Sequence, residues 1–62
     1  MTAAQKTAAQ KFQATMDAIR AGSISVDAAR EANRALRAGF TDAEWNQVKL
    51  GAFAVDQRRH GV

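Results

Sequence analysis

The sequence predicts an all-α protein, a small bundle of three helices in a single domain that spans residues 1–62. Apolar residues recur at helical spacing in three segments, and the chain contains no proline. Three of the four glycines lie at or beyond expected helix ends, where this residue is common. We therefore expect helices over about residues 2–21, 26–38 and 42–59.

The first expected helix, from about Thr2 to Ala21, is rich in alanine, which has the highest helix propensity. At about 100° per residue, its apolar side chains fall on one stripe. That stripe consists of Ala8, Ala9, Phe12, Met16 and Ile19. Gly22 follows the last turn, and a glycine at this position often ends a helix by taking a left-handed conformation.

The second expected helix begins after Ser25, whose hydroxyl is a good N-cap. Asp27 lies in its first turn, where a negative charge favours the positive end of the helix dipole. We expect its inward face to consist of Ala28, Ala29, Ala32 and Leu36. The helix should end at Gly39, by the same left-handed termination as at Gly22.

The third expected helix has the clearest start. Thr41 and Glu44 have the spacing of a capping box, in which each side chain accepts a hydrogen bond from the other residue's backbone N–H. Phe40 precedes this cap and Trp45 comes after it, at the two positions that form a hydrophobic staple. The helix should therefore begin directly after Thr41, with Phe40 packed against Trp45.

Composition argues against several classes of function. The formal net charge of +3, from nine lysines and arginines against six acids, permits nucleic acid binding without demanding it. There is no cysteine and His60 is the single histidine, so we expect no metal site and no cofactor. No phosphate loop or activated nucleophile is visible, so we expect neither an enzyme nor a small-molecule substrate. No apolar run suits a signal peptide or a membrane span, and the lack of cysteine fits a cytoplasmic protein.

The large apolar side chains are too few to form a deep core. Much of the 47% hydrophobic content is alanine, which buries little surface area on folding. Domains this small commonly gain stability from disulfides, metals or partner subunits. Because the composition argues against disulfides and metals, we expect the bundle to be completed by oligomerisation, as a homodimer or against a larger protein.

The third expected helix carries apolar side chains over more than half of its circumference. One face carries Trp45, Val48, Ala52 and Val55. Leu50 and Phe53 point elsewhere, on a side shared with Asn46 and Gln57. Either this helix lies in the groove between the other two, or Leu50 and Phe53 form an exposed ridge that a partner covers. We favour the ridge and predict a contact set of Leu50, Phe53 and Gln57, with Trp45 partly involved.

The sequence thus predicts a small non-enzymatic regulatory protein of the inhibitor or adaptor type, a class that phages and plasmids sometimes encode. It would act by self-association and by binding a larger protein. The alternative is a helix-turn-helix-like transcriptional regulator that binds nucleic acid through Arg30, Arg34 and Arg37, which repeat along one helical face. Two observations count against that alternative: Asp27 and Glu31 can pair with these arginines, and the would-be recognition helix begins with acidic residues.

Overall fold

A computed structural model describes residues 1–59 of the chain. In this range it contains three helices, α1 (Ala3–Arg20), α2 (Val26–Arg37) and α3 (Asp42–Arg59), and no strand. The predicted all-α class and the three predicted helices are confirmed, and every helix end lies within one residue of its expected position.

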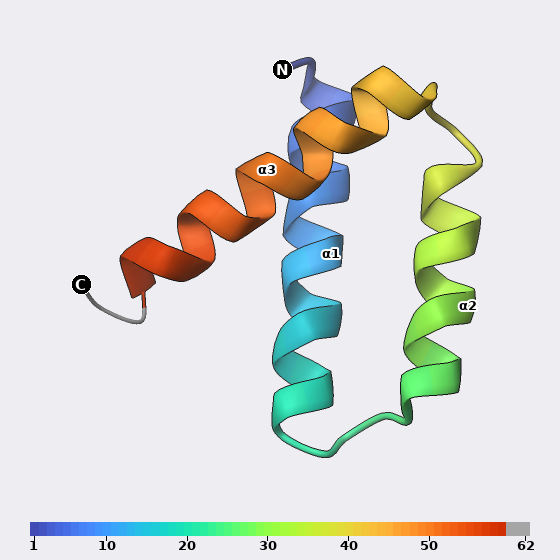
Figure 1. The fold of residues 1–62 in the computed structure, drawn as a ribbon, viewed down its shortest axis with the longest axis vertical. Helices are drawn as coiled ribbons and strands as arrows, with labels where there is room; N and C mark the ends of the chain where they lie inside the picture. The colour runs from blue at the N-terminus through green and yellow to red at the C-terminus, as the bar shows by residue number, and fades with distance from the viewer. Residues whose placement is uncertain (60–62) are drawn as a thin grey trace.

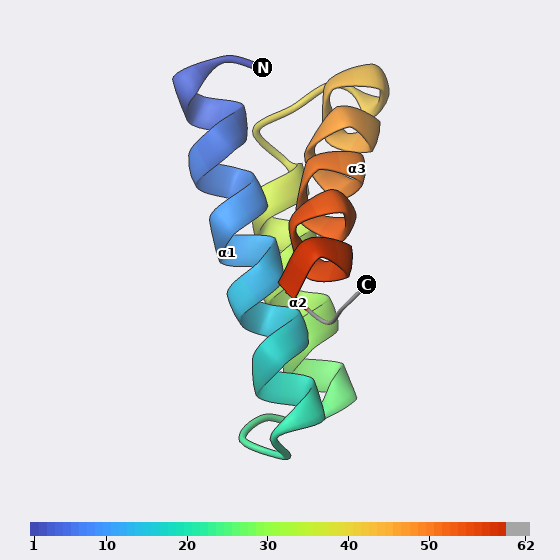
Figure 2. The same ribbon diagram turned by 90° about the vertical axis from the view of Figure 1, so that its left-hand side faces the viewer.

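The central element of the fold is α1. α2 runs back alongside α1, and α3 crosses α1 obliquely, so that α2 and α3 diverge from their joint (Figure 1). Most contacts between helices are made by α1, with α3 and with α2. The principal dimensions are 29 × 29 × 15 Å, and Figure 2 shows the thin direction of the molecule. The fold is therefore a flat, open three-helix bundle in which α3 packs on α1 and not in a groove between the other two helices.

Side chains cap the start of each helix. The Thr41 N–H donates to Glu44 Oε1 at 2.9 Å and the Glu44 N–H donates to Thr41 Oγ1 at 3.2 Å, which confirms the predicted capping box. Ser25 Oγ accepts from the Ala28 N–H at 3.1 Å, which confirms the predicted N-cap of α2. These bonds satisfy backbone donors that the first turn of a helix leaves without a partner.

A second capping box, at the start of α1, was not predicted. The Thr2 N–H donates to Gln5 Oε1 at 2.8 Å and the Gln5 N–H donates to Thr2 Oγ1 at 3.1 Å. The same Gln5 side chain is buried, and its Nε2 donates to the backbone oxygen of Glu44 at 3.4 Å and to Gln47 Oε1 at 3.2 Å. Gln5 therefore both caps α1 and fixes the start of α3 against it.

The two glycine joints differ in conformation. At the first, Gly22 has φ of 73°, and the Gly22 and Ser23 N–H groups donate to the carbonyls of Ile19 and Ala18. This pair of hydrogen bonds is a Schellman motif, and the predicted left-handed cap is confirmed. Gly39 also lies one position beyond its helix cap, but its φ is not positive, and its N–H donates to Leu36 three residues back. The prediction of a left-handed Gly39 was wrong, because the chain continues there in a tight 3₁₀-like turn.

The core is centred on Phe12. Its ring meets the ring of Trp45 edge-on at a centroid distance of 5.7 Å and the ring of Phe53 edge-on at 5.8 Å. Val48, which is fully buried, joins the same cluster. Phe40 lies 6.5 Å from Trp45 by ring centroids, which confirms the predicted staple. Around these side chains the helices approach one another through Ala8, Ala9 and Ala52.

Two of the predicted inward faces need correction. Ala28 and Ala32 are exposed, and the inward line of α2 consists of Ala29, Asn33 and Leu36. On α1 the predicted stripe holds except for Ile19, which is exposed. Each difference has its own cause in the packing of the helices. Because α2 packs mainly on α1, a narrow line of side chains suffices for the contact, and the end of α1 lies beyond the point where α3 crosses it (Figure 1).

Four charged side chains, which we call the ionic clasp, join α1 to the C-terminal half of α3. Arg20 donates two hydrogen bonds to Asp56, at 2.6 and 2.7 Å, and Arg59 donates to Asp17 at 3.0 Å. Arg20 also lies 3.5 Å from Asp17. Hydrogen bonding to Asp56 raises the pKa of Arg20, so the guanidinium stays charged. These ion pairs hold the C-terminal turns of α3 to α1 outside the buried cluster.

The capping box of α3 makes a pH-dependent contribution to stability. The hydrogen bond from the Thr41 backbone lowers the pKa of Glu44. A carboxylate with a lowered pKa stabilises the fold above its ordinary pKa, and this contribution is lost as the pH falls through the lowered value.

On acidification from about pH 6 to about pH 2, we expect the thermal midpoint to fall further in the wild type than in Glu44→Gln, which accepts the same bond without titrating. Circular dichroism measures both midpoints, and equal decreases would contradict the expectation.

Candidate functional site

One side of α3 is exposed and partly apolar, although Phe53 on this side also contacts Phe12 of α1. Its residues have a spacing of three and four along the helix, so they form one continuous stripe. We call this stripe the outer face of α3, and it consists of Ala43, Asn46, Leu50, Phe53 and Gln57, all of them exposed. Leu50 is 67% exposed and Phe53 is 46% exposed. Exposed side chains of this size gathered on one helix are typical of contact surfaces.

The two large side chains of the outer face differ in their attachment to the fold. Phe53 has one edge against Phe12 and leaves nearly half of its surface in solvent. Leu50 belongs neither to the buried cluster nor to the side chains packed against it. A change at Leu50 therefore alters the outer face alone, whereas a change at Phe53 also alters the core.

A shallow depression lies at the centre of the outer face. It has a volume of about 350 Å³ and is lined by Asn46, Lys49, Leu50 and Phe53. These four residues have the spacing i, i+3, i+4 and i+7, which is that of the four-residue hole into which a side chain of a facing helix inserts in a coiled coil. The outer face thus has the shape of one half of a helix–helix interface.

The structure separates Trp45 from the other residues of the predicted contact set. Leu50, Phe53 and Gln57 lie together on the outer face, whereas Trp45 is 5% exposed and packs between Phe12 and Phe40. Trp45 is a core residue, and the contact surface proposed below does not include it. The staple signal in the sequence already indicated this placement, since a staple residue packs toward the preceding joint.

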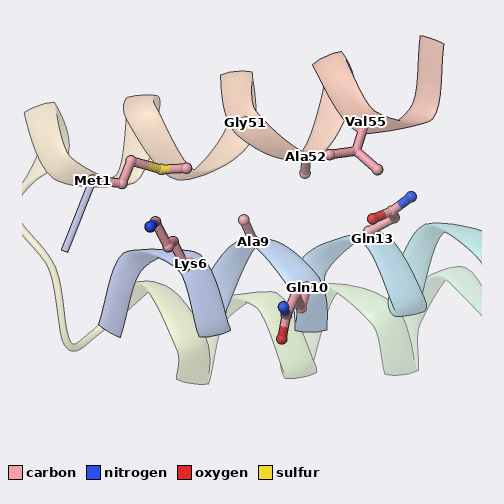
Figure 3. A pocket seen from close by; sticks show the side chains of 8 residues that line it. All are labelled: Met1, Lys6, Ala9, Gln10, Gln13, Gly51, Ala52 and Val55. Atoms are coloured by element: carbon pink, nitrogen blue, oxygen red, sulfur yellow. The ribbon is translucent and has the colours of Figure 1, made fainter. Parts of the chain in front are cut away.

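A groove between α1 and α3 lies on one flank of their crossing (Figure 3). Its volume is about 190 Å³, and its walls include Ala9, Gly51 and Val55, with the Met1 side chain extended along α3 (Figure 3). Gly51 therefore lies on the inner flank of α3 toward Met1 and Ala9, and not beside the exposed ridge. Its small size serves the crossing of these two helices.

A second concave site lies between α2 and the centre of the fold. This hollow has a volume of about 320 Å³, and it is lined by Phe12, Arg30, Asn33, Arg34, Arg37 and Trp45. The structure thus brings the three predicted arginines to one site. Each of them has a carboxylate nearby: Asp27 lies 4.0 Å from Arg30, Glu31 lies 3.4 Å from Arg34, and Asp42 lies 2.8 Å from Arg37. These acids reduce the positive field of the hollow, and its buried rings offer no face on which a base could stack.

The described part of the chain offers neither a metal site nor a membrane span. Within residues 1–59, no group of three His, Cys, Asp or Glu side chains could hold a metal ion. None of the helices in that range is long and apolar enough to cross a membrane. His60 lies outside the described residues. Comparison with protein-family models, curated proteins and solved structures gives no match for the chain.

The position of Gly51 predicts a stabilising substitution. A Cβ added there would lie 2.7 Å from the terminal carbon of Met1 and 3.9 Å from the Ala9 Cβ. The Met1 side chain is exposed and can swing aside, and the Ala9 distance is an ordinary contact. Since glycine costs about 1 kcal/mol relative to alanine within a helix, we expect Gly51→Ala to raise the free energy of unfolding by roughly 0.5–1 kcal/mol.

Urea denaturation followed by circular dichroism measures this change. Gly22→Ala is the matched control, because Gly22 has a φ of 73° that alanine rarely adopts, and it should lower the free energy of unfolding. A loss of stability in Gly51→Ala would show that the crossing tolerates no methyl group at this position.

Proposed function

We propose that the chain is a small, non-enzymatic protein-interaction module of the inhibitor or adaptor type, which self-associates and binds a larger protein through the outer face of α3. The observation that supports this proposal is the exposure of Leu50 and Phe53 on one continuous stripe of a folded helix. These two side chains carry the largest apolar surface of α3 that α1 does not cover. A partner that binds there removes this surface from water.

The energetics of the fold favour the same proposal. Of the seven buried apolar residues among those described, Phe12, Trp45 and Val48 are larger than alanine, so the core contributes little. Full burial of a side chain such as Leu50 or Phe53 is worth about 1.5–3 kcal/mol, which is large beside the stability of a domain this small. Association through the outer face would therefore stabilise the fold as well as serve recognition.

Leu50 provides the cleanest test of the outer face. We expect Leu50→Glu to lower the mass-average molecular weight in sedimentation equilibrium toward that of a monomer while the helical circular dichroism stays unchanged. Val26→Glu is the matched control, because Val26 is an exposed apolar residue on α2 and the charge change is the same. The control should associate like the wild type.

Two outcomes would contradict the proposed surface. If Leu50→Glu unfolds the chain while Val26→Glu does not, then Leu50 contributes to the fold and not to a contact. If the wild type sediments as a monomer up to about 1 mM, where even weak specific contacts form, then self-association fails. The proposal also includes a larger protein as a partner. Binding of such a protein by the wild type, and weaker binding by Leu50→Glu, would support that part of it.

A second candidate function, nucleic acid binding, is supported by the arrangement of Arg30, Arg34 and Arg37 around one hollow. Guanidinium groups along one helical face can track a phosphate backbone. In this case the logarithm of the affinity falls linearly with the logarithm of the salt concentration. The carboxylates beside the three arginines make this candidate the weaker one.

Fluorescence anisotropy with a labelled DNA duplex tests this candidate. The logarithm of the affinity is plotted against the logarithm of the salt concentration. The magnitude of the slope should decrease by about one for each of the three arginines replaced by alanine. Lys11→Ala, an exposed charge on α1 away from the hollow, is the matched control and should leave the slope unchanged. Absence of binding at about 50 mM salt would eliminate nucleic acid as the partner.

A further inference from the structure

We infer that the partner on the outer face of α3 is the same helix of a second copy, packed antiparallel about a two-fold axis between Leu50 and Phe53. This pairing rests on the proposed function and specifies the geometry of its self-association. Four features of α3 support it: the hole in the outer face, the distribution of charge along the helix, the polar residues that flank the stripe, and the clearance around it.

The hole fits a side chain of the same helix. Asn46, Lys49, Leu50 and Phe53 line the depression, and the outer face carries large apolar side chains at just two positions, Leu50 and Phe53. In an antiparallel pair with this axis, Leu50 of each copy lies at the level of Phe53 of the other. The Phe53 ring then enters the hole beside Leu50 of the second copy, and two-fold symmetry makes the contact twice.

The charges of α3 favour the antiparallel direction. Asp42 and Glu44 lie in its first turn, and Arg58 and Arg59 lie in its last turn. Antiparallel packing brings the acidic end of each copy beside the basic end of the other, and it also opposes the two helix dipoles. Parallel packing would place acids beside acids and arginines beside arginines. Within each copy Asp42 already pairs with Arg37 and Arg59 already pairs with Asp17, so the ends favour the antiparallel direction through the helix dipoles and the overall field and not through new ion pairs.

The flanking polar residues fit the same register. Asn46 of one copy lies opposite Gln57 of the other, and two side-chain amides can each donate and accept a hydrogen bond. Lys49 lies on the flank that carries Asp56, so the lysine of each copy comes near the Arg20–Asp56 pair of the other. The register thus gives polar partners to the polar residues that flank Leu50 and Phe53.

The rest of the chain leaves room for this partner. The residues by which α3 contacts the core, Trp45, Val48 and Ala52, lie on the opposite side of the helix from Leu50. All five residues of the outer face are exposed, although Phe53 also packs on Phe12 of α1 and keeps 46% of its surface in solvent. Two copies can therefore approach with α1 and α2 on the far sides of the pair.

Disulfide trapping in solution tests the direction and the register. The chain contains no cysteine, so introduced thiols have no competitor. We expect an equimolar mixture of Asn46→Cys and Gln57→Cys to give the mixed disulfide dimer in at least about tenfold excess over either homodimer, because a disulfide requires Cα atoms within about 7 Å. Mass spectrometry separates the mixed dimer from the two homodimers. Ala32→Cys, at an exposed position on α2, is the control. It should form only the small amount of disulfide dimer that arises from random collisions.

The outcomes separate this inference from the proposed function. If Asn46→Cys alone forms the homodimer efficiently, the helices are parallel and the inference is overturned, although self-association stands. If the wild type dimerises and none of the outer-face cysteines exceeds the Ala32→Cys background, another surface carries the contact and both the inference and the proposed surface fail. If no dimer forms at any concentration, self-association itself is refuted.

Discussion

The fold depends on the aromatic contact that Phe12 makes across the crossing of α1 and α3. This ring meets Trp45 at one end of α3 and Phe53 nearer its middle, so it fixes both the position and the angle of the crossing. Around this contact Val48 and three alanines fill the crossing and let the helices come close. The hydrogen bonds of Gln5 and the ionic clasp then hold α3 at its two ends.

The same contact explains why α3 has an open side. A helix that packs on a single neighbour buries one narrow stripe, and the opposite stripe stays in water unless another molecule covers it. In this chain α2 does not supply the second neighbour, since it diverges from α3 beyond their joint (Figure 1). The exposed surface of Leu50 and the part of Phe53 that does not pack on Phe12 are therefore left in solvent, and this is the physical basis for assigning them to recognition.

The sequence predicts the local structure of this chain better than its packing. Helix ends depend on residues within a few positions, such as Ser25 or the pair of Thr41 and Glu44, and those signals are all visible in the sequence. The capping box of Thr2 and Gln5 carries an equally plain signal, a threonine followed three residues later by a glutamine, and it could have been predicted.

The angles between helices depend on distant residues and could not be read from spacing. Leu50 points away from the buried face of α3, as helical periodicity predicts, whereas Phe53 reaches back to the ring of Phe12, which the periodicity did not predict. Ala28 was misplaced because the face that α2 turns inward depends on where α1 and α3 lie. Gly39 was misassigned because residues 18–22 (AIRAG) and 35–39 (ALRAG) are nearly identical, yet Gly22 has a positive φ and Gly39 does not.

The two ends of α3 are held by different forces, and this gives the helix an uneven response to its surroundings. Near Trp45 the attachment is apolar burial, which weakens on cooling and tolerates salt. Near Asp56 the attachment is the half-exposed ionic clasp, which salt screens. A concentrated brine would thus loosen the C-terminal turns first, whereas a cold, dilute solution would relax the N-terminal turns. Salt concentration and temperature therefore decide which end of this helix unwinds first.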